Sequence, residues 1–228
     1  MKLFLCGGGC GKQIFNAYQK FKKVIDKSKP ILYIPLAMEE EMYNSCYEWF
    51  SNEILNFGLT EFEMVKSSLE LSKKDFTKYS ALFIGGGNTY KLLKDLYDNS
   101  NYNKIIDYLK NGGIVFGGSA GAIIFGKDID SCLLEDKNNI NLKDTKGFNC
   151  LNEYSILCHL NKSKFKKNKD YLRKYSKSHK TIYLPEEDII YISNDKIKLI
   201  GNKKYIIFKA GNCSLHNFAN FKKDMYDK

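Results

Sequence analysis

Residues 114–125 read IVFGGSAGAIIF, and this segment gives the clearest indication of the fold. Its apolar beginning at 114–116 predicts a buried strand, and its apolar end at 122–125 predicts the start of a helix. The residues between them match the pattern G-x-S-x-G, which places Ser119 on a sharp turn from strand to helix. Small neighbours are needed there because the serine takes a strained backbone conformation. We therefore predict Ser119 as a nucleophile, with a tight structural turn as the alternative.

The same alternation of strands and helices extends back to the start of the chain. Apolar runs predict strands, and apolar residues at helical spacing predict the helices between them. The strands are expected at 2–6, 31–35, 62–65, 81–84 and 114–116. Because these runs are apolar throughout, they indicate a parallel sheet covered by helices on each side, and hence an α/β fold.

The regular alternation of strands and helices ends after residue 125. Residues 128–148 are polar and irregular, and residues 162–177 predict a basic helix. Short strands are expected at 155–158, 181–184, 189–193, 196–200 and 205–208, with a hairpin turn at Asn194-Asp195. No linker-like composition divides the chain, so residues 1–228 are expected to form one domain.

Composition argues against several classes of protein. The net charge is +10, but the cations are nearly all lysine, so charge alone does not indicate a nucleic-acid partner. Seven cysteines without a C-x-x-C pair indicate neither a disulfide framework nor a zinc site, and reduced thiols in the cytoplasm fit best. No apolar stretch approaches the roughly 20 residues that a membrane span needs, and no signal peptide is recognisable. A cytoplasmic protein without metal, cofactor or membrane partner is expected.

Two more glycine-rich loops follow predicted strands. Residues 85–89 (GGGNT) end one strand and open a helix, so their N–H groups face the crevice where an oxyanion could bind. A requirement for close packing alone is the alternative. Residues 7–13 (GGGCGKQ) look like a phosphate-binding loop, but Cys6 stands at its first glycine and Gln13 at its Ser/Thr position. Nucleotide binding is therefore not expected.

A serine nucleophile needs a base, and the chain has three histidines. His159 closes the apolar run 156–158 and is expected at a strand end, within hydrogen-bond reach of Ser119, whereas His179 lies between lysines and His216 lies near the C-terminus. A buried structural histidine is the alternative. The acidic residues that could orient the base are Asp128, Asp130, Glu135, Asp136 and Glu186, and spacing alone selects none of them.

The one dense basic segment, residues 162–180, follows His159 directly. A solvated helix face, recognition of an anionic substrate group and nucleic-acid binding are its three interpretations. Arg173 is the leading candidate for holding a substrate carboxylate, because it is the only arginine and a guanidinium offers two parallel hydrogen bonds.

Three segments together resemble the peptidase E family of serine peptidases, which includes cyanophycinases: 83–89 (FIGGGNT), 117–122 (GGSAGA) and 184–186 (LPE). Their order and separations match over nearly the whole chain. The resemblance implies a flavodoxin-like fold of the class I glutamine-amidotransferase type. It also implies hydrolysis of short peptides, and for peptidase E itself of dipeptides with an N-terminal aspartate. A small peptide and, as an open alternative, a second copy of the chain are the expected partners.

Carried over position by position, the resemblance places the nucleophile on Ser119 and the base on His159. It places the oxyanion site on Gly87 and the amide of Ala120. Asn88, Thr89 and Glu186, together with Arg173, are further residues expected to bind the substrate. Asp136 is the best match for the acidic member of the triad, and Glu186 is its rival. Gly118 differs from peptidase E, in which a large aromatic residue precedes the serine. The resemblance therefore does not imply the same pocket shape or the same specificity for aspartate.

Proteins with this fold can have functions other than peptide hydrolysis. A glutamine amidotransferase would need a cysteine nucleophile and a late His-x-Glu pair, and the sequence has neither. An esterase or amidase with a non-peptide substrate stays open, as does a non-catalytic binding module.

Overall fold

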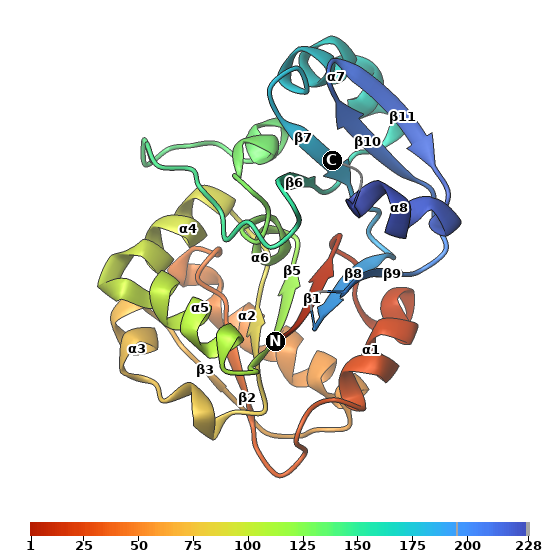
Figure 1. Ribbon diagram of the computed structural model, residues 1–228. Helices are drawn as coiled ribbons and strands as arrows, with labels where there is room; N and C mark the ends of the chain where they lie inside the picture. The colour runs from red at the N-terminus through yellow and green to blue at the C-terminus, as the bar shows by residue number, and fades with distance from the viewer. Residues whose placement is uncertain (195, 227–228) are drawn as a thin grey trace.

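Two β-sheets form the frame of the molecule in a computed structural model that describes residues 1–194 and 196–226 (Figure 1). The main sheet has seven strands in the order β3-β2-β4-β5-β1-β8-β9, and the small sheet has four in the order β11-β10-β7-β6. Figure 1 shows the small sheet above the upper ends of β1 and β5.

The main sheet is mostly parallel. Its strands are β1 (Lys2–Cys6), β2 (Ile31–Ile34), β3 (Phe62–Met64), β4 (Ala81–Ile84), β5 (Ile114–Gly118), β8 (Ile189–Ser193) and β9 (Lys196–Ile200). The first five run parallel, while β8 is antiparallel to β1 and β9 is antiparallel to β8. This arrangement confirms the α/β fold predicted from the buried apolar runs. The turn was predicted at Asn194-Asp195, between β8 and β9, and Asp195 lies outside the described residues.

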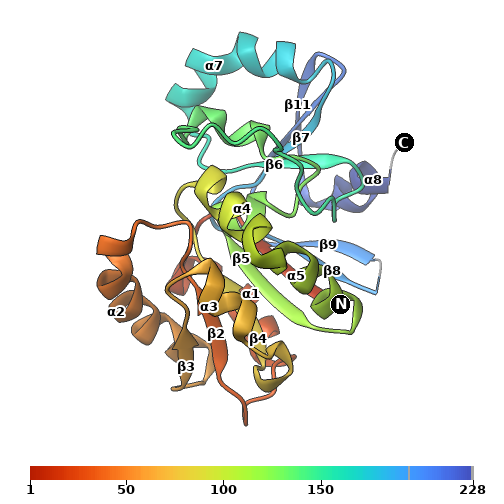
Figure 2. The same cartoon turned by 90° about the vertical axis from the view of Figure 1, so that its left-hand side faces the viewer.

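Helices cover both faces of the main sheet (Figure 2). They are α1 (Phe15–Lys22), α2 (Tyr43–Glu53), α3 (Ser68–Lys73), α4 (Thr89–Tyr97), α5 (Asn101–Lys110) and α6 (Ala120–Ile123). Because successive side chains of a strand point to opposite faces, Phe4 packs with α1 and α2, whereas Leu3 and Leu5 pack with α3, α4 and α5. Phe83 and Phe116 stack at 4.9 Å in the α1–α2 layer. No helix in the described ranges has the length and apolar character that crossing a membrane requires.

The small sheet comes from the C-terminal third of the chain. Its elements are β6 (Tyr154–Leu157), α7 (Lys162–Tyr175), β7 (Lys180–Tyr183), β10 (Tyr205–Lys209), β11 (Asn212–His216) and α8 (Phe221–Tyr226). The parallel pair β6 and β7 is joined through α7, and β10 and β11 add antiparallel strands. Short 3-10 helices occur at Gly11–Ile14, Glu40–Met42, Ile54–Phe57, Phe76–Lys78, Asp98–Ser100, Asp130–Leu134 and Phe218–Asn220.

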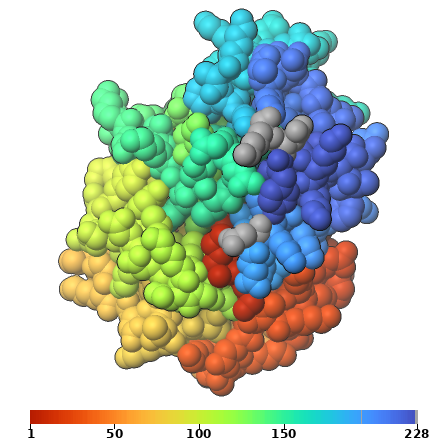
Figure 3. Space-filling model, viewed as in Figure 1, coloured from red at the N-terminus to blue at the C-terminus, as the bar shows by residue number. Residues whose placement is uncertain are grey.

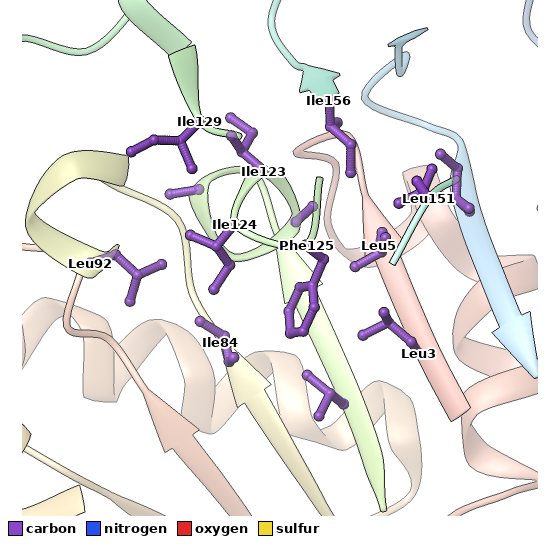
Figure 4. Packing of buried hydrophobic residues seen from close by; sticks show 14 of the residues in the cluster. Leu3, Leu5, Ile84, Leu92, Ile123, Ile124, Phe125, Ile129, Leu151 and Ile156 are labelled. Carbon is purple, nitrogen blue, oxygen red and sulfur yellow. The ribbon is translucent and has the colours of Figure 1, made fainter. Parts of the chain in front are cut away.

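One hydrophobic core connects the two sheets. Ile156 of β6 belongs to the same buried cluster as Leu5 of β1 and Ile123 of α6, and Figure 4 shows these side chains close to one another. Figure 3 shows the blue C-terminal part of the chain in contact with the orange N-terminal part. The ends of β6 and β7 therefore lie over the carboxyl ends of the main-sheet strands.

Candidate active site

Ser119 stands on a strained turn between β5 and α6, with φ of 52° and ψ of −113°. Its N–H donates to the carbonyl of Cys6 at 3.1 Å. A Cβ atom at Gly117 would lie 2.1 Å from the carbonyl oxygen of Gly121, and one at Gly121 would lie 2.2 Å from that of Ile84. Strand and helix thus approach so closely that only glycine fits on either side of the serine. This geometry is the sharp turn that the G-x-S-x-G pattern predicted.

His159 reaches this serine from the small sheet. It lies just beyond the end of β6, and its Nε2 atom is 2.7 Å from Oγ of Ser119. The distance lies within the range expected between a serine nucleophile and its base. His159 itself has a positive φ of 57°, so its backbone turns sharply where the strand ends.

Glu186 holds the other side of the imidazole. Its Oε1 atom lies 2.9 Å from Nδ1 of His159, and it follows β7 after Leu184 and Pro185. When Nδ1 donates its proton to this carboxylate, Nε2 is left as the acceptor for the hydroxyl of Ser119. The side chains of His159 and Glu186 are 32% and 48% exposed, so the pair faces an open crevice.

Asp136 does not contact His159, and the prediction that it would be the acidic partner is wrong. Its Oδ2 atom accepts the N–H of Thr89 at 2.8 Å and also the hydroxyl of Thr89. Thr89 is the first residue of α4, whose N–H has no acceptor inside the helix. A carboxylate there also interacts favourably with the helix dipole. Asp136 therefore fastens residues 128–148 to α4, and Glu186 takes the place beside the imidazole.

Asn88 and Thr89 were predicted as substrate-binding residues. Their side chains instead form hydrogen bonds with α4 and with the segment 128–148. The side-chain oxygen of Asn88 accepts the N–H of Lys91 at 3.0 Å, and its Nδ2 donates to the carbonyl of Lys137 at 2.9 Å. Thr89 is held by Asp136. Their side chains therefore shape the loop around the site rather than face Ser119.

The loop at Gly85–Gly87 passes directly against the nucleophile. A Cβ atom at Gly86 would lie 3.1 Å from Cβ of Ser119 and 3.6 Å from its Oγ. Gly87 has φ of 134°, and a Cβ there would lie 2.4 Å from the carbonyl oxygen of Ala37. Ala120 opens α6, so its N–H has no acceptor within the helix. The Gly85–Gly87 loop thus lies against the nucleophile, and Ala120 directly follows Ser119 in the chain.

The loop at Gly7–Gly9, whose resemblance to a phosphate-binding loop the sequence argued against, supports the base and its acidic partner. A Cβ atom at Gly8, where φ is 128°, would lie 2.4 Å from Cε1 of His159. The N–H of Gly9 donates to the carbonyl of Glu186 at 2.8 Å. The sequence did not predict this supporting role. The position of the three glycines, at the end of a strand that neighbours β5, could have indicated it.

Arg173 lies away from the site, which contradicts its predicted role in holding a substrate carboxylate. It is in the last turn of α7, about 16 Å along the helix from Lys162, and its charge acts on Cys213. Lys164, one turn into α7, instead lines a pocket of about 390 Å³ together with His159 and Glu186. Lys164 forms an ion pair with Glu135.

The cysteines near the site are poor nucleophiles. Burial raises the pKa of Cys6 to about 12, and it raises the pKa of Cys158 well above its ordinary value. Both thiols therefore stay protonated at neutral pH. Within the described ranges, no group of three His, Cys, Asp or Glu side chains is arranged to hold a metal ion.

The fold and the site together define a serine hydrolase of the α/β class. Residues 3–200 match Peptidase family S51, and the chain belongs to this family. It is therefore a serine peptidase. It is 26% identical over 216 residues to Peptidase E of Nostoc sp., an alignment that covers 87% of this chain and 84% of that protein.

Two solved structures share the fold. One is described as a putative peptidase E protein from Listeria monocytogenes, with a TM-score of 0.69, 23% identity, and coverage of 87% of this chain and 97% of that one. The other is a peptidase from an acI-B1 Actinobacterium, with a TM-score of 0.69, 20% identity, and coverage of 94% and 93%. The α/β architecture is thus shared over almost the full length of both.

Proposed function

We propose that this peptidase hydrolyses short peptides through a triad of Ser119, His159 and Glu186. The observation that carries the proposal is the continuous series of contacts, 2.7 Å from Oγ to Nε2 and 2.9 Å from Nδ1 to the carboxylate. The strained turn at Ser119, the glycine loop packed against it and the glycine loop packed against His159 are typical of a functional site rather than of a purely structural turn.

The chemistry follows from this order of atoms. Oγ of Ser119 attacks the scissile carbonyl carbon while its proton passes to Nε2 of His159. The carbonyl oxygen becomes negative and is stabilised by N–H groups at Gly87 and Ala120. His159 then gives its proton to the leaving amine, the C–N bond breaks, and an acyl-enzyme remains. A water molecule, deprotonated by the same imidazole, releases the acid and regenerates the serine.

Glu186 orients and stabilises the imidazole without taking its proton. Its carboxylate accepts the Nδ1 proton, which fixes the tautomer that leaves Nε2 free. The negative charge also favours the imidazolium that forms during attack. Because Glu186 is half exposed, water screens part of this interaction.

The space around the triad favours short substrates. A pocket of about 270 Å³ lies beside Gly86, and one of about 390 Å³ lies beside His159. An N-terminal acidic residue is the preference that the family resemblance implies. Arg173, its expected partner, lies at the far end of α7, so the proposal is limited to short peptides in general.

The test is hydrolysis of a library of dipeptides and tripeptides by the wild-type enzyme and by Ser119→Ala. Loss of one hydroxyl changes the core little but removes the nucleophile, so turnover should fall by a factor of about 1000 or more with unchanged circular dichroism. Ser178→Ala, which removes an exposed hydroxyl beyond the C-terminal end of α7, is the matched control and should keep full turnover. Turnover that survives in Ser119→Ala would refute the proposal.

A further inference from the structure

An apolar pocket of about 270 Å³ opens beside the Gly85–Gly87 loop. Side chains from β2, from the loop that follows it and from α2 surround the backbone of Gly86. These side chains are Tyr33, Met38, Met42, Ser45, Cys46 and Trp49. Two of them leave apolar surface open to solvent at the rim, because Met42 is 44% exposed and Trp49 is 39% exposed. Exposed apolar surface around a hollow marks a binding site more often than a purely structural feature.

The pocket lies on the side of Ser119 opposite the imidazole of His159. In the main sheet, β5 has β4 on one side and β1 on the other. Gly86 follows β4 and approaches Ser119, whereas His159 packs on Gly8, which follows β1. The pocket and the imidazole thus flank Ser119 from opposite sides. Because His159 must protonate the leaving amine, the leaving part of the substrate lies on its side, and the acyl part lies toward Gly86.

The electrostatics of this pocket disfavour an acidic substrate side chain. None of the lining residues carries a charge at neutral pH, because desolvation raises the pKa of the Cys46 thiol, and the phenol of Tyr33 is also buried. Residues 39–41, which directly precede Met42, are three exposed glutamates. Lys91 reaches the same loop, but it already donates to the carbonyl of Leu36 at 2.8 Å and to Asp95 at 3.2 Å. A carboxylate entering here would lose its hydration without gaining a cation.

The shape of the pocket and the residues that line it suit a flexible apolar side chain. Met38 and Met42 are unbranched and adjust to different shapes, and Trp49 offers a flat aromatic wall. The sulfur of Met38 also lies close to Gly87, since a Cβ atom there would be 2.8 Å from it. A side chain bound in the pocket would therefore touch the same loop that faces the reacting carbonyl.

We propose that this pocket binds the residue on the acyl side of the scissile bond, and that the enzyme prefers an apolar N-terminal residue to an acidic one. The inference rests on the proposed function, since it assigns the substrate class of the same active site. The three glutamates at 39–41 suit the positive α-amino group of such a substrate.

The first arm of the test compares dipeptides that differ only in the N-terminal residue, Leu-Ala, Met-Ala, Asn-Ala and Asp-Ala. We expect kcat/KM for Leu-Ala and Met-Ala to exceed that for Asp-Ala by about tenfold or more, the scale that an unpaired buried carboxylate sets. An equal or higher kcat/KM for Asp-Ala would overturn the inference.

The second arm uses Met42→Lys, which places an ammonium group at the rim of the pocket. The ratio of kcat/KM for Asp-Ala to that for Leu-Ala should rise at least about tenfold in this variant. Leu55→Lys adds the same charge at a residue that is 58% exposed and lies outside the pocket, and it should leave the ratio unchanged. Equal ratios in the two variants would overturn the assignment of the pocket.

A fluorophosphonate probe, read by mass spectrometry, separates the two levels of the account. If Ser119 is labelled but Asp-Ala is the better substrate, the inference fails and the proposed function stands. If Ser119 is not labelled and no dipeptide is cleaved, the proposed function fails and the inference fails with it.

Discussion

Glu186 works on His159 from a position that is half open to water. The carboxylate is fastened through its backbone, because the carbonyl of Glu186 accepts the N–H of Gly9 at 2.8 Å and Pro185 precedes it. The same loop also packs against the imidazole, since a Cβ atom at Gly8 would lie 2.4 Å from Cε1 of His159. Tight backbone packing, rather than burial of the charge, therefore sets the geometry of the triad.

Substituting the two competing carboxylates separates their roles. Glu186→Gln keeps the shape but removes the charge beside Nδ1, so kcat should fall by about 10- to 1000-fold while the melting temperature stays nearly unchanged. Asp136→Asn weakens the attachment to the first turn of α4 and should cost about 1 kcal/mol of stability, with a much smaller effect on kcat.

Steady-state kinetics and thermal unfolding of both variants check this pair of expectations. A large loss of kcat in Asp136→Asn, with Glu186→Gln fully active, would restore Asp136 as the acidic residue of the triad.

Ser119 and His159 could be predicted from the sequence because each depends on local signals. The serine lies in a five-residue pattern between a strand and a helix, and the histidine closes an apolar run. The choice between Asp136 and Glu186 could not be made in this way. It depends on how far the irregular segment 128–148 extends before it packs on α4, which only the three-dimensional arrangement determines. The predicted role of Arg173 was wrong for a related reason, since the sequence does not show which end of the helix faces the site.

At the scale of elements, the turn between β5 and α6 distinguishes neighbouring glycines. A Cβ atom at Gly117 would lie 2.1 Å from the carbonyl oxygen of Gly121, whereas one at Gly118 would have no atom within 4 Å. The backbone of Gly121, which that Cβ atom would meet, cannot move away without separating the strand from the helix. The open space at Gly118 marks a place where a larger side chain fits beside the nucleophile.

Gly117→Ala and Gly118→Ala form a matched pair that tests this geometry. Gly117→Ala should destabilise the enzyme by about 3 kcal/mol or more and abolish activity. Gly118→Ala should be neutral or stabilise by up to about 1 kcal/mol, because alanine has fewer unfolded conformations. Urea unfolding followed by circular dichroism measures both. Equal losses in the two variants would mean that the turn does not have the described close approach.

The elements predicted correctly are those with a strong internal pattern. The buried strands β1, β4 and β8 have the bounds that their apolar runs indicated, and β9, in which exposed and buried residues alternate, also has its predicted bounds. The edge strand β11 was missed because its side chains are mostly exposed and give no apolar run. The short helices α3 and α8 were missed as well, since α3 buries only Leu71 and α8 has six residues. Such elements are stabilised by contacts with the rest of the fold, which a local pattern does not contain.

At the scale of the whole molecule, the active site depends on two sheets being held together. Ser119 follows a strand of the main sheet, whereas His159 and Glu186 follow strands of the small sheet. Ile156 of β6, which is fully buried, joins the two across the shared core (Figure 4). We therefore expect the two sheets to unfold together.

Ile156→Ala tests this coupling. Removing the buried side chain should cost about 2–5 kcal/mol. The single tryptophan, Trp49, lies in α2 on the far side of the main sheet and reports on that layer. Trp49 fluorescence and far-UV circular dichroism should shift to lower urea by the same amount. A fluorescence transition that stays at the wild-type position would show that the sheets unfold independently.

The triad of Ser119, His159 and Glu186 is tested by the site at which a fluorophosphonate probe reacts with the enzyme. We expect one covalent adduct, mapped by mass spectrometry to Ser119, that forms at least about tenfold more slowly in Glu186→Gln and is absent in Ser119→Ala. An adduct on another residue, or equal labelling of the wild type and Ser119→Ala, would contradict this expectation.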